Sequence, residues 1–316
     1  MQVDRLPQLD GGLFLTDGGI ETTLIFHRGI DLPLFAAFAL LDDEQGRETL
    51  RDYYEPYLRS AAAHDAGFVL ESATWRASSR WGEELGYSPE QLATLNRRSI
   101  ELLAELRAEH QGKLKDPIVI SGCIGPQDDG YQPSQLLSAQ DAERYHATQI
   151  ETFAATAADM VTAITMTYAD EAIGIARAAA AVGLPAVISF TVETDGRLPS
   201  GQALAEAIEQ VDSEARDAPA YYMVNCAHPT HFDRVLDPDA AWAGRIRGLR
   251  ANASTMSHAE LDEATELDEG DPTDLGARYA ELRSRLPNLC VLGGCCGTDE
   301  RHVEAIASAW RSAAPT

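Results

Sequence analysis

Lysine and long apolar runs are both scarce in this sequence of 316 residues. Lys113 and Lys115 are its lysines, and 25 basic residues stand against 50 acidic ones, for a formal net charge of -25. A surface so rich in carboxylates repels phosphate backbones and anionic headgroups, which argues against nucleic-acid binding and peripheral membrane attachment. No apolar run approaches the ~18 residues of a membrane span, so we expect no membrane-embedded segment.

Cysteine is also sparse, with five residues in the chain. This number is odd and too small for the disulfide framework of a secreted scaffold, which favours a reducing compartment. The first residues, Met1 to Pro7, lack the basic and apolar regions of a secretory signal. We therefore expect a cytoplasmic protein, and the composition favours no particular oligomeric state.

Short apolar or β-branched runs recur along the chain, and most gaps between them hold Ala-, Glu- and Arg-rich stretches of helical period. Eight runs predict strands: Leu13–Asp17, Phe68–Ala73, Pro117–Gly122, Met160–Met166, Ala186–Val192, Tyr221–Cys226, Ile246–Asn252 and Cys290–Gly294. The gaps predict helices in six segments: Glu48–Ala66, Ser88–His110, Ala139–Ala158, Asp170–Val182, Ser200–Ala215 and Thr273–Arg285.

A strand followed by a helix, repeated eight times, is typical of a (β/α)8 TIM barrel, an α/β fold. An open doubly wound sheet is disfavoured because Asp17-Gly18-Gly19 stands where a G-x-G-x-x-G loop would follow the first strand. No linker or internal repeat divides the chain. We therefore expect residues 1–316 to form a single barrel domain.

The segment 257–274 departs from the repeating pattern. It contains few apolar residues and eight acidic ones: Glu260, Asp262, Glu263, Glu266, Asp268, Glu269, Asp271 and Asp274. Such a composition predicts an acidic surface excursion within the domain. A lid or a partner-binding segment is the alternative interpretation.

Three cysteines lie at or just after the ends of two of the predicted strands. Cys295 and Cys296 lie in Gly293-Gly294-Cys295-Cys296-Gly297-Thr298, and Cys226 ends the sixth strand. The C-terminal ends of barrel strands open onto one face, so the three thiols can converge there. Zinc with three protein ligands and one open position uses such a set, and it holds a substrate thiol as a nucleophilic thiolate at neutral pH.

Other interpretations of the cysteines remain open at this point. Cys295 and Cys296 could form a vicinal disulfide, all three thiols could be inert core residues, or a redox pair could exchange disulfides without a C-x-x-C motif. Neither Cys123 nor Cys290 stands in a spacing that would pair it with another cysteine, and we expect both to pack in the core.

The cysteine motif, Asn225-Cys226 with Gly293 to Thr298, resembles that of the homocysteine S-methyltransferase family, which includes betaine-homocysteine methyltransferases and the homocysteine domain of cobalamin-dependent methionine synthase. The likeness covers about residues 10 to 310. Further stretches that resemble the family are Thr16–Thr22 with its Asp-Gly-Gly, Glu71–Ser78, Gly122–Pro126, Ile188–Thr191 and Ser200-Gly201.

The resemblance implies a barrel in which Cys226, Cys295 and Cys296 bind Zn²⁺ and the metal takes the thiolate of homocysteine as a further ligand. The sulfur then receives a methyl group from a small onium donor, with S-methylmethionine or S-adenosylmethionine favoured, in an in-line displacement that gives methionine. The partners are thus a small thiol acceptor and a small methyl donor, and no catalytic residue beyond the zinc ligands is required.

The same resemblance implies a set of substrate-binding residues, with the amides of Gly18 and Gly19 donating to the substrate carboxylate. The set is Asp17, Gly18, Gly19, Glu71, Ser72 and Thr74.

One position departs from the family. Where the family has a glutamate that contacts the substrate ammonium, this chain has Ile164. A buried ammonium without an acidic partner loses affinity, so Glu71, Glu21 or Glu193 would have to substitute. The alternatives are a methyltransferase for another thiol, a non-catalytic zinc- and thiol-binding barrel, or a cysteine-based redox protein.

Overall fold

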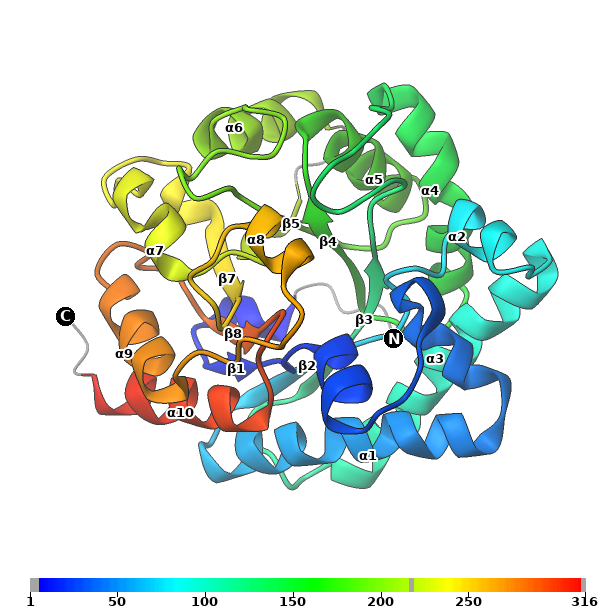
Figure 1. Ribbon diagram of the computed structural model, residues 1–316, viewed down its shortest axis with the longest axis horizontal. Helices are drawn as coiled ribbons and strands as arrows, with labels where there is room; N and C mark the ends of the chain where they lie inside the picture. Colours follow the sequence, from blue (N-terminus) through cyan, green and yellow to red (C-terminus); the bar gives the residue numbers. More distant parts are fainter. Residues whose placement is uncertain (1–5, 216–218, 314–316) are drawn as a thin grey trace.

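The computed structural model describes residues 6–215 and 219–313, so the ends of the predicted domain, 1–316, lie outside the described residues. Within these ranges eight parallel strands close into a barrel in chain order, with β1 (Phe14–Leu15) paired to both β2 (Gly67–Glu71) and β8 (Val291–Gly294). Helices surround the strands as an outer ring (Figure 1). The chain is a single-domain (β/α)8 barrel, which confirms the predicted fold class.

The remaining strands are β3 (Ile118–Ile124), β4 (Met160–Met166), β5 (Ala186–Phe190), β6 (Tyr221–Asn225) and β7 (Ile246–Ala251). The helices are α1 (Glu44–Ala63), α2 (Ser79–Glu84), α3 (Pro89–His110), α4 (Ala139–Ala154), α5 (Ala169–Ala181), α6 (Leu204–Glu214), α7 (Pro229–Phe232), α8 (His258–Glu263), α9 (Pro272–Leu282) and α10 (Glu300–Ser312). Shorter helical turns are η1 (Pro7–Asp10), η2 (Thr22–His27), η3 (Pro33–Phe35), η4 (Ala37–Asp42), η5 (Asp233–Val235) and η6 (Ala243–Arg245).

Most predicted strands run past the observed ends on the C-terminal side. Asp17, Ala73, Cys226 and Asn252 were expected inside strands, but each lies just beyond one. The backbone there turns away from the extended conformation, as the φ of +52° at Cys226 shows. These residues therefore belong to the loops that follow the strands.

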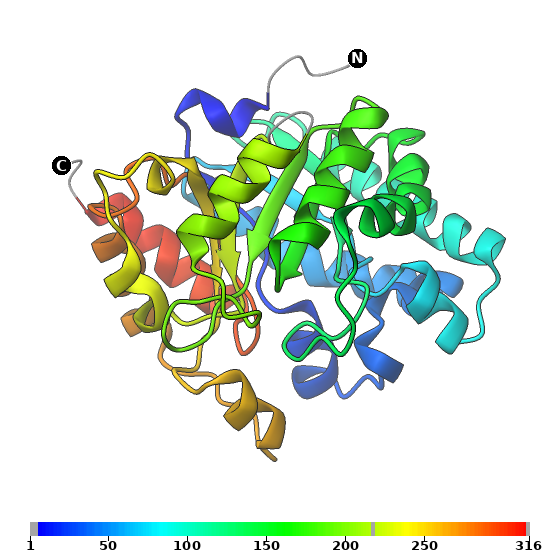
Figure 2. The same cartoon turned by 90° about the horizontal axis from the view of Figure 1, so that it is seen from above.

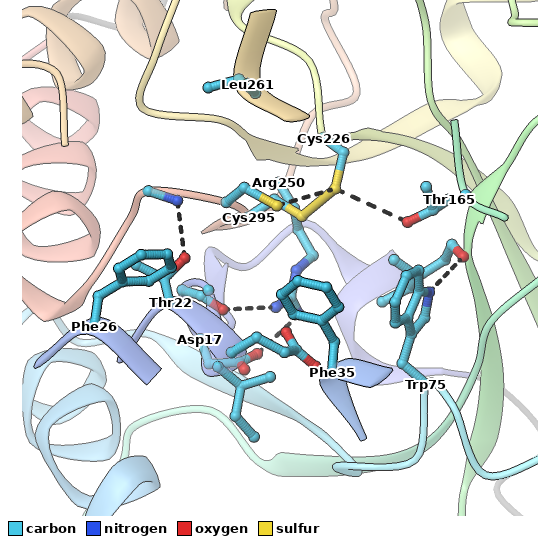
Figure 3. Close-up of a pocket in the computed structure, with 18 of the residues that line it drawn as sticks. Asp17, Thr22, Phe26, Phe35, Trp75, Thr165, Cys226, Arg250, Leu261 and Cys295 are labelled. Carbon is cyan, nitrogen blue, oxygen red and sulfur yellow. Dashed lines mark hydrogen bonds and ion pairs between the residues drawn. A yellow bond between two sulfur atoms is a disulfide. The ribbon is translucent and has the colours of Figure 1, made fainter. Parts of the chain in front are cut away.

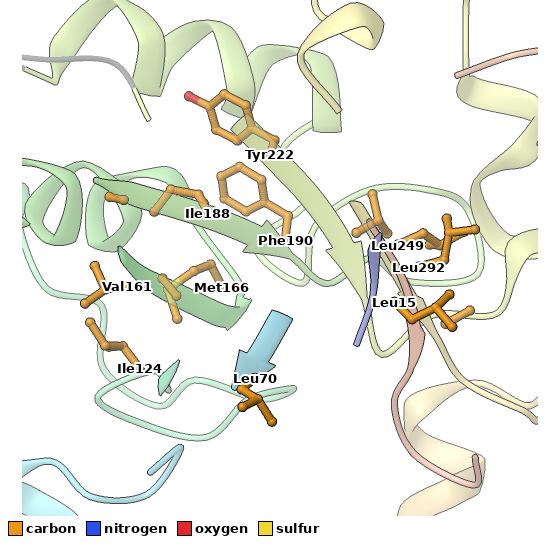
Figure 4. Packing of buried hydrophobic residues seen from close by; sticks show 14 of the residues in the cluster. Leu15, Leu70, Ile124, Val161, Met166, Ile188, Phe190, Tyr222, Leu249 and Leu292 are labelled. Carbon is orange, nitrogen blue, oxygen red and sulfur yellow. The ribbon is translucent and has the colours of Figure 1, made fainter. Parts of the chain in front are cut away.

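The apolar core lies in two places. A large cluster fills the space between strands and helices, and Figure 4 shows Leu70, Ile188 and Leu249 among its members. A smaller cluster fills the N-terminal end of the barrel with residues such as Leu6, Phe14 and Tyr221, and Leu9 of η1 packs against it. Figure 2 shows η1 and α8 at opposite sides of the molecule. The N-terminal end of the barrel is thus closed, which leaves the opposite end for a site.

Capping side chains fix the starts of several helices. Ser88 and Gln91 satisfy each other's amides at the start of α3, and Pro89 occupies its first position. Asp299 accepts from the amide of Arg301 at the start of α10, a helix that the sequence analysis did not predict. Since α10 follows the Cys295–Thr298 loop directly, its cap also restrains that loop.

The segment 257–274 follows β7, carries the short helix α8 and ends in the first turn of α9. Figure 1 shows α8 inside the ring of helices, over the end of the barrel. Most side chains of the segment are exposed, although His258 is buried. Among the described helices, none combines the length and apolar character that a bilayer span requires.

Candidate metal and substrate site

A pocket of about 320 Å³ opens at the C-terminal end of the barrel, where strand-following loops meet. It is lined by residues from distant parts of the chain, among them Asp17, Glu71, Ile164, Arg250 and Cys295. Figure 3 shows the sulfur atoms above the buried charged residues. Its location is the one at which barrels of this class place their active sites.

Cys226, Cys295 and Cys296 all line this pocket, as the sequence analysis expected. Their sulfur atoms lie within 4.8 Å of one another, close enough to share one metal ion. The Sγ atoms of Cys226 and Cys296 are 4.0 Å apart. Because thiolates are preferred ligands of soft and borderline metals, this donor set fits an ion such as zinc with one coordination position left open toward the pocket.

In the structure, Cys226 and Cys295 are joined as a disulfide, with 5.4 Å between their Cα atoms. The vicinal Cys295–Cys296 disulfide considered from the sequence is not formed; Cys296 is free. The barrel brings Cys226 against Cys295 because their strands β6 and β8 flank β7 on the same rim. This arrangement is the oxidised state of the cysteine set, and metal binding requires reduction of both residues to thiolates.

Asn225 orients the groups around the sulfur atoms. Its side-chain oxygen accepts from the Thr165 amide at 3.0 Å and the Ser189 hydroxyl at 2.6 Å. Its amide nitrogen donates to the Thr165 hydroxyl at 2.9 Å and lies 3.9 Å from the Cys295 Sγ. Thr165 adopts a φ of +68°, so this buried asparagine holds β4 in a strained turn beside the cysteines.

Asp17 is fully engaged by neighbouring groups. Its Oδ1 atom lies 2.8 Å from the Nη1 of Arg250 and accepts from the Thr16 hydroxyl at 3.0 Å. Its Oδ2 atom accepts from the Tyr53 hydroxyl at 2.8 Å. Arg250 also donates to the carbonyls of Gly294 and Gly18. The aspartate expected to contact the substrate is thus neutralised by a buried arginine that the sequence analysis missed.

Two further acids of the pocket are Glu71, which is buried, and Glu21, which is partly exposed. Burial raises the pKa of Glu71 to about 7, although the positive charge of Arg250 acts in the opposite direction. Burial also raises the pKa of Glu21 to about 7. The Oε2 atom of Glu71 has no hydrogen-bond partner among the described residues. Of the three acids considered as substitutes for the family's glutamate, Glu71 and Glu21 line the pocket, whereas Glu193 does not and contacts His258 instead.

The other implied substrate residues differ in their availability. Gly18, Gly19 and Ser72 line the pocket, but Thr74 does not and donates its hydroxyl to the Cys123 carbonyl. The amide of Gly19 donates to the Thr298 carbonyl at 3.0 Å, so it is not free for a substrate carboxylate. A side chain at Gly19 would meet the Cys295 carbonyl at 2.5 Å, which explains why glycine is required there.

Of the two remaining cysteines, Cys290 packs below the barrel, with its thiol 3.2 Å from the Gln8 carbonyl. Cys123 is buried in β3 and also borders the pocket. Burial raises the pKa of the Cys123 thiol well above its ordinary value, which keeps it unreactive.

The acidic segment borders the mouth of the pocket. Leu261, Asp262, Glu266, Leu267 and Asp268 are among the lining residues. Contacts fix both ends of the segment. At its start, the His258 ring stacks on Tyr131 at 4.1 Å and its Nε2 lies 2.6 Å from the Cys226 carbonyl oxygen. Near its end, Glu269 lies 2.9 Å from Arg301 and 2.7 Å from His27 of η2. The segment is therefore part of the site's rim as well as a surface excursion.

Comparisons with known proteins identify the family of the chain. The model of the family described as homocysteine S-methyltransferase matches residues 14–310. The selenocysteine Se-methyltransferase of Brassica oleracea var. italica is 26% identical over 94% of this chain and 88% of its own. The homocysteine S-methyltransferase 4 of Zea mays is 26% identical over 96% of this chain and 91% of its own.

Solved structures show the same fold. The oxidized form of the homocysteine methyltransferase MmuM from Escherichia coli superposes with a TM-score of 0.75, at 19% identity, over 96% of this chain and 98% of that one. Its metallated form gives a TM-score of 0.72, at 18% identity, over 95% and 97% of the two chains. With the family model matching nearly the whole chain, this protein is an enzyme of the homocysteine S-methyltransferase family.

Proposed function

We propose that this protein is a zinc-dependent S-methyltransferase that transfers a methyl group from a small onium donor to the thiolate of homocysteine, giving methionine. The observation that carries the proposal is the convergence of three cysteine sulfurs within 4.8 Å of one another in a pocket of about 320 Å³. A zinc ion bound there would lower the pKa of a substrate thiol, so that the nucleophile is a thiolate at neutral pH.

The protein's own residues position the acceptor sulfur and surround it partly with apolar side chains. Asn225 and Thr165 hold the rim of β4 and β6 against the cysteines, which fixes where an acceptor sulfur can lie. Ile164, Phe26 and Phe35 contribute apolar side chains to the pocket lining, with Ile164 buried and the two phenylalanines each 54% exposed. No general base is needed once the thiol is ionised, so the main task of the protein is to align donor and acceptor.

The charge of the pocket favours a cationic donor. Its lining includes seven carboxylate side chains, Asp17, Glu21, Glu71, Asp129, Asp262, Glu266 and Asp268, against two guanidinium groups, Arg76 and Arg250. An onium group is attracted to such a site and loses its charge on methyl transfer, so the neutral product is released more easily. S-methylmethionine and S-adenosylmethionine both have this chemistry.

Another acceptor is the second candidate. Ile164 offers no charge to a substrate ammonium, and Asp17 is paired with Arg250. One relative acts on selenocysteine, as its name states. A thiol or selenol other than homocysteine therefore remains the alternative, whereas membership of an enzyme family argues against a non-catalytic barrel.

The test combines metal analysis with a substrate matrix. Protein purified under reducing conditions should contain about one zinc per chain, and Cys296→Ala should lose both the metal and the activity. Homocysteine, selenocysteine and cysteine are each assayed against S-methylmethionine, S-adenosylmethionine, betaine and methyltetrahydrofolate. Fastest turnover of homocysteine with a sulfonium supports the proposal, and full activity in zinc-free wild-type protein would refute it.

A further inference from the structure

Arg76 is a buried cation in the pocket that the proposed reaction does not yet use. It follows β2 and is 7% exposed, and its side chain lines the same pocket as the three cysteines. Its guanidinium carbon lies 4.1 Å from the centre of the Trp75 ring and 3.7 Å from that of Trp81. The guanidinium is therefore held between two indole rings, which stabilise its charge without using its N–H groups.

Both rings are themselves fixed in place. The indole nitrogen of Trp75 donates to the Ile164 carbonyl at 3.2 Å, and that of Trp81 donates to the Pro126 carbonyl at 3.4 Å. Gly125 allows this packing, because a side chain there would meet the Trp75 carbonyl at 2.2 Å. The chain thus builds a rigid holder around a single arginine, which is the arrangement expected of a recognition group.

The hydrogen bonds of Arg76 are incomplete. Among the described residues its one partner is the Asp128 carbonyl, 3.3 Å from Nη1, and its Nε atom is buried without any partner. The Asp128 carboxylate is not available, because it binds Arg80 and Ser134. Asp129 and Glu21 contribute favourable charge at longer range, but neither forms an ion pair with Arg76. A buried guanidinium with unused donors favours an anionic ligand.

We propose that Arg76 is a specificity-determining residue that binds the carboxylate of a substrate in this pocket. The inference rests on the proposed function for the identity of the pocket. A carboxylate matches the planar edge of a guanidinium and carries one negative charge. A phosphate group, with nearly two charges, would be opposed by the neighbouring Glu21 and Asp129.

The Gly19 amide, one of the two amides expected to bind a substrate carboxylate, is not free for this role, because it already donates to Thr298. Arg250 is occupied by Asp17, Thr16 and two carbonyls. Of the two cations that line the pocket, Arg76 is the one with donors to spare. The carboxylate can come from the thiol acceptor or from the methyl donor, since both substrate classes include amino acids and related acids.

The experiment is calorimetric titration of the intact, reduced protein with two matched pairs of probes. The acceptor pair is methylthiobutyrate and its alcohol, methylthiobutanol, which resemble a methylated acceptor with and without the carboxylate. The donor pair is dimethylsulfoniopropionate and trimethylsulfonium. We expect wild-type protein to bind the acid of one pair about 10- to 100-fold more tightly than its uncharged or carboxylate-free counterpart. The pair that shows this preference identifies the source of the carboxylate.

The variants decide whether Arg76 causes the preference. Arg76→Met and Arg76→Gln should each reduce the preference to less than about 3-fold, with thermal unfolding used to select folded protein. Arg80→Met is the matched control, because Arg80 also lies near Trp81, at 5.2 Å, but does not line the pocket. Its preference should remain that of the wild type.

Two results would overturn the assignment: no preference in the wild type for either pair, or an unchanged preference in a folded Arg76 variant. The titration measures binding and requires no turnover. Failure of methyl transfer would therefore count against the proposed function alone, whereas a wild-type protein without the carboxylate preference, or a folded Arg76 variant that keeps it, counts against the role of Arg76 alone.

Discussion

Asp17 and Arg250 form an ion pair inside the barrel, with 2.8 Å between Oδ1 and Nη1 and both side chains almost completely buried. The two residues come from the strands that flank β8, because Asp17 follows β1 and Arg250 lies in β7. The pair joins three adjacent strands at the floor of the pocket, since Arg250 also donates to the carbonyl of Gly294 in β8. The Asp17–Arg250 ion pair therefore links strands of the barrel and also places two charged groups in the pocket.

Removal of the arginine should destabilise the fold. Arg250→Met leaves the Asp17 carboxylate buried without its cation, and we expect the free energy of unfolding to fall by about 3–5 kcal/mol. Urea unfolding at neutral pH measures this change. Arg278→Met is the control, because its pair with Asp274 is exposed and should cost less than about 1 kcal/mol. Equal losses in the two variants would contradict a buried role for Arg250.

Glu71 should make stability depend on pH. Its pKa is raised by burial from 4.5 to about 7, so the folded state binds a proton more tightly than the unfolded state does. The stability that the protonated group contributes is present below pH 4.5 and is lost as the pH rises through 7. Glu71→Gln mimics the neutral acid, so its stability relative to wild type should rise by up to about 3 kcal/mol between pH 4.5 and pH 8. Urea unfolding of both proteins across this pH range tests the prediction. Parallel curves of unfolding free energy against pH for the two proteins would contradict it.

Metal binding should require a reductant. The Cys226–Cys295 disulfide removes two of the three thiolates, so oxidised protein should bind far less zinc than protein treated with a thiol-free phosphine reductant. Zinc per chain, measured by mass spectrometry after gel filtration, should rise from near zero toward one. Cys290→Ser serves as the control, because Cys290 lies at the closed end of the barrel and its loss should leave zinc content unchanged. Full loading of the oxidised protein would show that the metal binds elsewhere.

Asn225 should matter for the metal although it is not a ligand. Asn225→Ala removes its bonds to Thr165 and Ser189 and frees the turn beside the cysteines. We expect zinc affinity to fall about 10-fold or more and stability to fall by about 1–3 kcal/mol. Competition with a chelating dye reports the affinity. Asn288→Ala removes a single exposed bond to the Gly244 carbonyl and should change neither quantity measurably.

The barrel was predictable because its signal repeats. Each strand is an apolar run such as Met160–Met166, and most are followed by a segment of helical period, so errors at single boundaries do not alter the topology. The convergence of Cys226 with Cys295 and Cys296 was predictable for a related reason: all three follow strands, and the fold brings the C-terminal ends of strands together.

The charged floor of the pocket was not predictable in the same way. Arg250 stands in a short strand whose sequence, Ile246–Ala251, gives no sign that the arginine points inward, and its partner Asp17 is remote in the chain. Arg76 lies in a loop, where its contact with Trp81 depends on tertiary packing. The acidic segment was expected at the surface from its charge, but its place over the pocket depends on contacts of His258 and Glu269 that leave no periodic pattern.

The closed N-terminal end of the barrel bears on the order of binding expected for the proposed reaction. Within residues 6–215 and 219–313, the apolar cluster beside η1 fills one end of the barrel, and the pocket lies at the other end, where segment 257–274 contributes to its lining. If the thiol acceptor binds against the cysteines, as we propose, a donor that enters from the same end has to bind over it. We therefore expect the acceptor to bind before the donor and the methylated thiol to leave last.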